Sequence, residues 1–98
     1  MYNNLKNGEL AVHRINLAAR QGDGNSASYL LQMYLNGEEI AQYRIVANVW
    51  ATVAFAKRIE GAGEILTMLN EELTEEETDQ SIQILTEIYK DHPKMLGG

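Results

Sequence analysis

Residues 22–37, GDGNSASYLLQMYLNG, and residues 41–58, AQYRIVANVWATVAFAKR, together decide the fold. The first stretch has apolar residues at helical spacing and a glycine at each end, which is typical of helix boundaries. The second mixes alanines and valines with Trp50, a composition that suits a buried helix in close contact with its neighbours. These two helices, separated by a short loop, predict an antiparallel pair.

Three further helices are predicted around this pair. The segment from about residue 5 to 21 carries apolar residues on two stripes, so it should be covered on two sides. A fourth helix ends near Leu73, and Thr74 with Glu77 forms a capping box that starts a fifth helix, which ends before Pro93. The fifth helix is expected to bury Ile82, Leu85, Ile88 and Tyr89. No stretch has the alternating pattern of a strand, so the expected fold class is all-α.

The chain also resembles itself at a spacing of 36 residues. Identical apolar pairs are Ala11 with Ala47, Ala18 with Ala54, and Leu30 with Leu66. Alanine is expected where two helices approach closest, because a larger side chain would wedge them apart. A two-helix period of this length is typical of an αα-hairpin repeat, or short α-solenoid. We therefore expect a single domain over 1–98, divided into a partial repeat (about 5–21), a full repeat (22–57) and a second repeat with a C-terminal capping helix (58–91).

Residues 22–37 resemble the first half of a Sel1-like repeat, a relative of the tetratricopeptide repeat, most clearly in residues 33–37, MYLNG. The stretch 47–54 is similar to the second half of that repeat, and residues 69–89 are similar to the helix that often closes such arrays. The chain departs from the family where glycine is usual, at Leu31, Glu39 and Arg58. The resemblance implies participation in protein complexes and gives no particular partner.

Composition and charge exclude several classes of function. The chain has 98 residues, 45% of them apolar, and a net charge of −6. Residues 1–58 hold six Lys and Arg against four Asp and Glu, a net +2, whereas residues 59–98 hold two against ten, a net −8. An acidic half without a basic cluster predicts no binding to nucleic acid and none to an anionic membrane.

The expected location is the cytoplasm. The N-terminal residues lack the charged and then apolar pattern of a signal peptide, and the longest apolar run, residues 45–56, is too short to span a bilayer. The absence of cysteine rules out disulfides, thiolate metal sites and cysteine nucleophiles.

No catalytic residue, metal site or cofactor is predicted, and the chain is not expected to be an enzyme. His13 follows Glu9 by one helical turn, but no third ligand is near, so a surface Glu–His pair is favoured over a metal site. The serines lack the glycines of a nucleophile elbow, and the acidic run 71–77 lacks the ligand spacing of a calcium loop.

The leading interpretation is a non-catalytic scaffold or adaptor that presents a rigid helical-repeat surface to a protein or peptide. Tyr29, Gln32 and Tyr43 are the predicted contact residues, since tyrosine is a common interface anchor. For Tyr29, packing between helices is an equally good explanation. Trp50 is expected in the core.

The alternative interpretation is a small acidic inhibitor, an immunity-type or phage-encoded antagonist that covers a basic site on its target. Its binding face would run from Glu60 to Asp79 and include Glu72 and Glu76.

Self-association is also expected. In the repeat register, residues 5–21 form the second helix of a pair whose first helix is absent. An exposed stripe on this helix, with Leu10, Val12 and Leu17, should then pair with its copy in a twofold dimer. A compact monomer, in which the fifth helix folds back over the stripe, is the other outcome.

Overall fold

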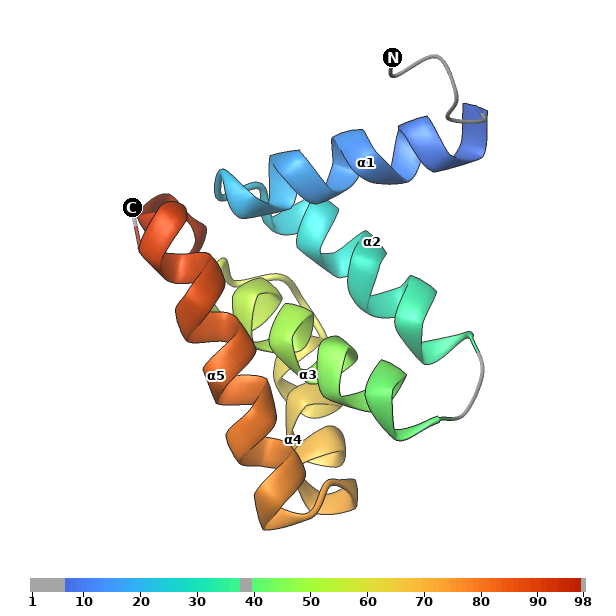
Figure 1. The fold of residues 1–98 in the computed structure, drawn as a ribbon, viewed down its shortest axis with the longest axis vertical. Coiled ribbons are helices and arrows are strands. Elements are labelled where there is room, and N and C mark those ends of the chain that lie inside the picture. Colours follow the sequence, from blue (N-terminus) through green and yellow to red (C-terminus); the bar gives the residue numbers. More distant parts are fainter. Residues whose placement is uncertain (1–6, 38–39, 98) are drawn as a thin grey trace.

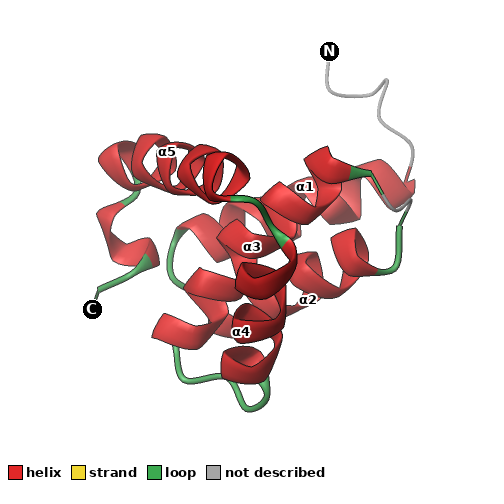
Figure 2. Ribbon diagram, turned by 90° about the horizontal axis from the view of Figure 1, so that it is seen from below, coloured by secondary structure: helices red, strands yellow, loops and turns green. Residues whose placement is uncertain are grey.

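All the secondary structure in the described residues is helical. The computed structural model describes residues 7–37 and 40–97, and within them the chain forms five α-helices, a short 3₁₀ helix and no strand (Figures 1 and 2). The helices are α1 (Asn7–Arg20), α2 (Gly24–Leu35), α3 (Ala41–Ala56), α4 (Ala62–Glu72), α5 (Glu75–Asp91) and the 3₁₀ helix η2 (Pro93–Met95). The all-α prediction is confirmed. The predicted start of the first helix, near residue 5, lies outside the described residues.

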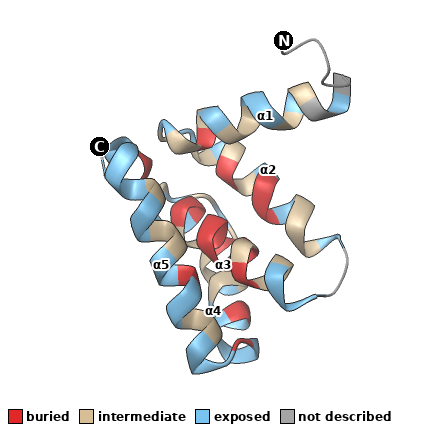
Figure 3. Cartoon of the chain, viewed as in Figure 1, coloured by how far each residue is buried: buried red, intermediate tan, exposed pale blue. Residues whose placement is uncertain are grey.

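Helix α3 lies at the centre of the molecule. It contacts α2 most broadly, and also α4 and α5, whereas α5 touches α4 only slightly. Trp50 is 2% exposed, which confirms its predicted place in the core. The Arg20 guanidinium lies 6.0 Å from the centroid of the Trp50 ring, within the range of a cation–π contact. Half of the residues of α3 are buried (Figure 3), and these are Ile45, Ala47, Asn48, Val49, Trp50, Ala51, Val53 and Ala54.

The turn after α1 recurs after α3. Gly22 has a φ of +104°, and the amide of the next residue, Asp23, donates to the carbonyl of Ala18 at 3.0 Å. Thirty-six residues later Arg58 has a φ of +62°, and the Ile59 amide donates to the Ala54 carbonyl, again at 3.0 Å. Both helices thus end in the same left-handed cap, once with the glycine that this conformation favours and once without it.

The N-termini of α5 and α2 are capped differently. The Glu77 amide donates to the Thr74 hydroxyl at 3.1 Å, and the Thr74 amide donates to the Glu77 carboxylate at 2.9 Å, so the predicted capping box is confirmed. Asp23 stands at the N-cap of α2, but its carboxylate accepts the Ser26 hydroxyl at 2.5 Å and no amide of the helix.

Removing the Thr74 cap of α5 should weaken the fold more than reversing a nearby surface charge. Thr74→Ala is expected to lower the free energy of unfolding by about 1 kcal/mol, because the Glu77 amide at the start of α5 loses the hydroxyl that accepts its hydrogen bond. Glu76→Lys, on the exposed side of the same turn, should change it by less than about 0.5 kcal/mol. Urea denaturation followed by circular dichroism measures both variants, and an equal loss in each would contradict the role of the cap.

The predicted apolar face of α5 is wrong at two of its four residues. Leu85 and Ile88 pack against the core, but Ile82 and Tyr89 are 55% and 44% exposed. The reason is a buried polar contact, in which the Ser81 hydroxyl donates to Asn48 Oδ1 at 2.7 Å. This bond turns the Ser81 edge of α5 toward α3, and Ile82 consequently faces outward.

Asn48 extends that contact into a network across three helices. Its Nδ2 donates to Asn70 Oδ1 at 2.9 Å, so α3 is joined to α4 as well as to α5. Asn48 and Ser81 are both buried, and a buried polar group without a partner would destabilise the fold. The network therefore favours one rotation of each helix over others of similar apolar packing.

The C-terminal segment closes the molecule against the turn between α1 and α2. Met95 is fully buried, and Lys57 Nζ donates to the carbonyls of Lys94 and Gly97 at 3.0 and 3.1 Å. A Cβ atom placed on Gly22 would lie 2.7 Å from the Lys94 carbonyl oxygen. The segment that follows α5 thus reaches α1, which otherwise packs mainly against α2.

Candidate interaction surfaces

Tyr29 and Gln32 lie together on the outer face of α2. They are one helical turn apart, and Gln32 is exposed. Tyr29 is 55% exposed, so much of its side chain remains accessible and is not packed between helices. An exposed tyrosine beside an amide side chain can supply both apolar contact area and hydrogen bonds to a partner.

Tyr43 packs within the fold and does not join this pair. Its ring meets that of Tyr34 edge to face, with ring centroids 5.5 Å apart and an interplanar angle of 79°. A Cβ atom on Gly37 would lie 3.1 Å from the Tyr43 ring, so this glycine allows the ring to approach the end of α2. Tyr34 lies about 140° around α2 from Tyr29, which separates the two predicted contact tyrosines.

The predicted acidic residues lie where α4 meets α5. Glu72 and Glu76 are both exposed, but Glu72 forms an ion pair with Arg44 of α3. Further exposed acids at this end of the molecule are Glu71, Glu75 and Asp79. A negative surface is therefore present, although part of the Glu72 charge is already compensated within the fold.

The three predicted self-association residues on α1 differ in their surroundings. Leu17 is 43% exposed, Leu10 is half-buried, and Val12 packs against the core together with Ile15. Leu10 and Leu17 are seven residues apart and so share one side of the helix, with the exposed Arg14 between them.

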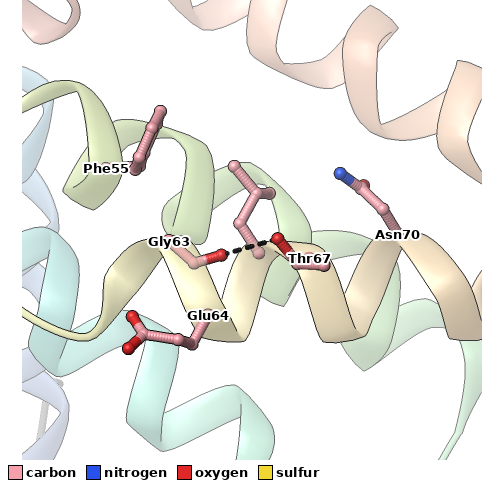
Figure 4. A pocket seen from close by; sticks show the side chains of 6 residues that line it. Phe55, Gly63, Glu64, Thr67 and Asn70 are labelled. Atoms are coloured by element: carbon pink, nitrogen blue, oxygen red, sulfur yellow. Dashed lines mark hydrogen bonds between the residues drawn. The ribbon is translucent and has the colours of Figure 1, made fainter.

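A shallow depression on α4 was not predicted. It has a volume of about 670 Å³ and opens beside the Phe55 ring, which is 56% exposed (Figure 4). A Cβ on Gly63 would lie 3.2 Å from that ring, so the glycine lets Phe55 lie against the start of α4. The other lining residues are Glu64, Leu66, Thr67 and Asn70. One sequence signal could have revealed the site. At the 36-residue spacing, Ala19 corresponds to the much larger Phe55, whereas Ala27 corresponds to the smaller Gly63.

A smaller cavity, of about 450 Å³, lies where α1 and α5 end. Arg20, Asp91, His92 and Lys94 are among its lining residues. Two helix C-termini meet there, and cationic side chains offset the partial negative charge of their carbonyls. This arrangement explains Arg20 and Lys94 as stabilising charges.

The described residues hold neither a metal-ligand cluster nor a helix able to span a membrane. In the part of the chain that the structure describes, no group of three or more His, Asp or Glu side chains is placed to hold a metal ion. His13 is exposed, and the side chain of Glu9 lies outside the described residues. None of the helices within 7–37 and 40–97 has the length and apolar character needed to cross a membrane.

Comparison with known proteins shows no family for this chain. It matches no protein-family model, no curated protein and no solved structure. The resemblance of residues 22–37 to a Sel1-like repeat therefore stays a prediction.

Proposed function

We propose that the chain is a short αα-hairpin repeat of the Sel1-like type that acts, in the cytoplasm, as a non-catalytic module for binding a protein or peptide. The observation that carries the proposal is Tyr29, an aromatic side chain 55% exposed on α2, with Gln32 one turn away. The repeated turns after α1 and α3 support the repeat.

Rigidity is the physical basis of the proposed mechanism. Helix α2 is anchored to α3 through Ala27, Leu30 and Leu31, which are buried in one cluster with Trp50. Tyr29 is thus held on a framework that need not become ordered when a partner binds. Binding to such a surface loses little conformational entropy, and most of the contact energy is available for affinity.

Affinity capture with two matched variants tests the proposal. The wild-type chain, Tyr29→Ala and Ile82→Ala are immobilised and exposed to an extract of the source cells, and the retained proteins are identified by mass spectrometry. Ile82 is as exposed as Tyr29 but lies on α5, so it is the matched control. We expect a protein retained by the wild type and by Ile82→Ala, with at least about tenfold weaker binding to Tyr29→Ala. Retention of the same proteins by all three chains would contradict the proposed site.

The acidic antagonist is the second candidate, and the cluster of exposed acids where α4 meets α5 favours it. Such a partner would be strongly basic, and its affinity would fall steeply with salt because exposed charges are screened over about 8 Å at physiological ionic strength. Binding centred on Tyr29 should change little between low and high salt. Repeating the capture at both salt concentrations separates the two functions.

A further inference from the structure

The residues that line the depression beside Phe55 correspond, 36 positions earlier in the chain, to residues of the core. Four of its lining residues stand 36 positions after residues that are at most 1% exposed. The aligned pairs are Phe55 with Ala19, Gly63 with Ala27, Leu66 with Leu30, and Thr67 with Leu31. In the first pair of helices this face belongs to the cluster that α2 shares with α3, and α2–α3 is the broadest helix contact in the molecule.

No helix of the described chain covers the same face of α4. By position along the chain, α5 would be the one to do so, as α3 does for α2. Instead, α5 packs against α3 and touches α4 only slightly, since its Ser81 edge is bound to Asn48. The α4 face is therefore left open as the depression (Figure 4).

Helix α1 carries the complementary free face. Leu10, Arg14 and Leu17 follow one side of α1; Arg14 is exposed, Leu17 is 43% exposed and Leu10 is half-buried. Thirty-six residues later, the corresponding side of α3 consists of Val46, Trp50 and Val53, and the last two are buried in the cluster shared with α2. The side of α1 that carries Leu10, Arg14 and Leu17 is thus free, although the corresponding side of α3 is packed in the core.

We propose that these two faces bind each other between copies of this chain, with α1 of one copy packed on α4 of the next. The contact would repeat between molecules the packing of α3 on α2 within one molecule. It joins different faces of the two copies, so it adds copies head to tail into a chain or a closed ring, unlike a twofold dimer.

Charge selects α1 as the occupant. Glu64 lines the depression on α4, and Glu71 lies two helical turns further along the same helix; both are exposed. Helix α1 contains Arg14 and Arg20 against the single acid Glu9, a net charge of +1 with His13 neutral. The two faces are therefore of opposite charge, which favours their association.

The exposed stripe of α5 is the competing occupant. Ile82 and Tyr89 are both exposed, but Asp79 and Glu75 lie one turn and two turns before Ile82 along α5. Packing this stripe on α4 would bring four carboxylates together at the edge of a desolvated contact, and like charges at an interface oppose binding.

Sedimentation velocity on two single-face variants tests the proposal. Leu17→Glu removes the α1 face and Phe55→Glu removes the depression, and both positions are exposed enough for a charge to be tolerated by the fold. The wild type should rise above its monomer mass of 11.0 kDa as concentration increases from about 10 μM to about 1 mM. Each variant alone should stay at the monomer mass. An equal mixture should form a complex of two chains and stop there, because each variant contributes its one intact face.

Ile82→Glu is the matched control, since Ile82 is similarly exposed and lies on neither face; this variant should associate like the wild type. Arg14→Glu provides a second test on a fully surface residue and should weaken association at least about tenfold. Circular dichroism melting verifies that every variant is folded.

Three results would overturn the proposal. A dimer of Phe55→Glu alone would indicate a twofold pair through α1, and a monomeric Ile82→Glu would make α5 the occupant. A wild type that remains monomeric at about 1 mM would exclude self-association of every kind. The inference goes beyond the proposed function and needs no foreign partner, so failure to capture a protein through Tyr29 leaves it unaffected.

Discussion

Ala54→Trp is expected to lower the free energy of unfolding by at least about 3 kcal/mol and the melting temperature by more than about 10 °C. Ala54 is fully buried in α3, in the cluster that includes Leu30 and Leu31 of α2. An indole at this position would force apart helices that are in close contact, and the nearby buried side chains have no free volume into which to move.

Ala56→Trp is the matched control for this change. Ala56 lies two residues further along α3 and is exposed, so its side chain can grow into solvent. Thermal unfolding followed by circular dichroism should show a shift of only a few degrees for Ala56→Trp. Equal melting temperatures for the two variants would mean that the side of α3 that carries Ala54 is not buried. The predicted 36-residue repeat register would then be wrong as well.

Gly22→Ala is expected to destabilise the protein by about 2–4 kcal/mol, for two separable reasons. The first is backbone strain, because a φ of +104° disfavours any residue with a Cβ atom. The second is steric, because the new Cβ would meet the Lys94 carbonyl oxygen at 2.7 Å and push the C-terminal segment away from the turn. Met95, now fully buried, would then be partly exposed to water.

Two further positions separate strain from clash. Gly61 has a φ of +85° but nothing within 4 Å of its Cβ position, so Gly61→Ala should lose only about 1 kcal/mol, from strain alone. Arg58 already has a φ of +62°, and Arg58→Gly should raise the free energy of unfolding by up to about 1 kcal/mol. Urea denaturation of the three variants measures the free energy of unfolding of each and so ranks their stabilities. If Gly22→Ala were no worse than Gly61→Ala, the packing of the C-terminal segment on this turn would be contradicted.

The positions of the helices were determined by the sequence because their causes are local. Apolar spacing along each segment, glycines at the ends and the Thr74–Glu77 capping box act over a few residues, and the helices begin and end close to where those signals predict. Trp50 could be assigned to the core for the same reason, since residues 45–56 have only Asn48 and Thr52 as polar residues and so have few positions to expose.

The candidate sites were predictable only in part. Tyr29, Gln32 and Glu76 are exposed as their proposed roles require, whereas Tyr43 packs on Tyr34 and Glu72 is paired with Arg44. Exposure depends on which side of a helix meets its neighbour, and periodicity does not determine that when two sides are comparably apolar.

Tertiary structure alone decided the rotation of α5, the open face of α4 and the closure of the molecule by the C-terminal segment. Each depends on a contact between residues far apart in the chain. The Ser81–Asn48 bond sets the rotation of α5 and leaves the α4 face open, and Lys57 binds the carbonyl of Lys94 in the C-terminal segment. The apolar pattern of α5 permits either of two faces to be buried, and one hydrogen bond to a buried asparagine selects between them. Local sequence thus determined where the helices are, and a few polar and steric contacts between helices determined which faces remain free to bind.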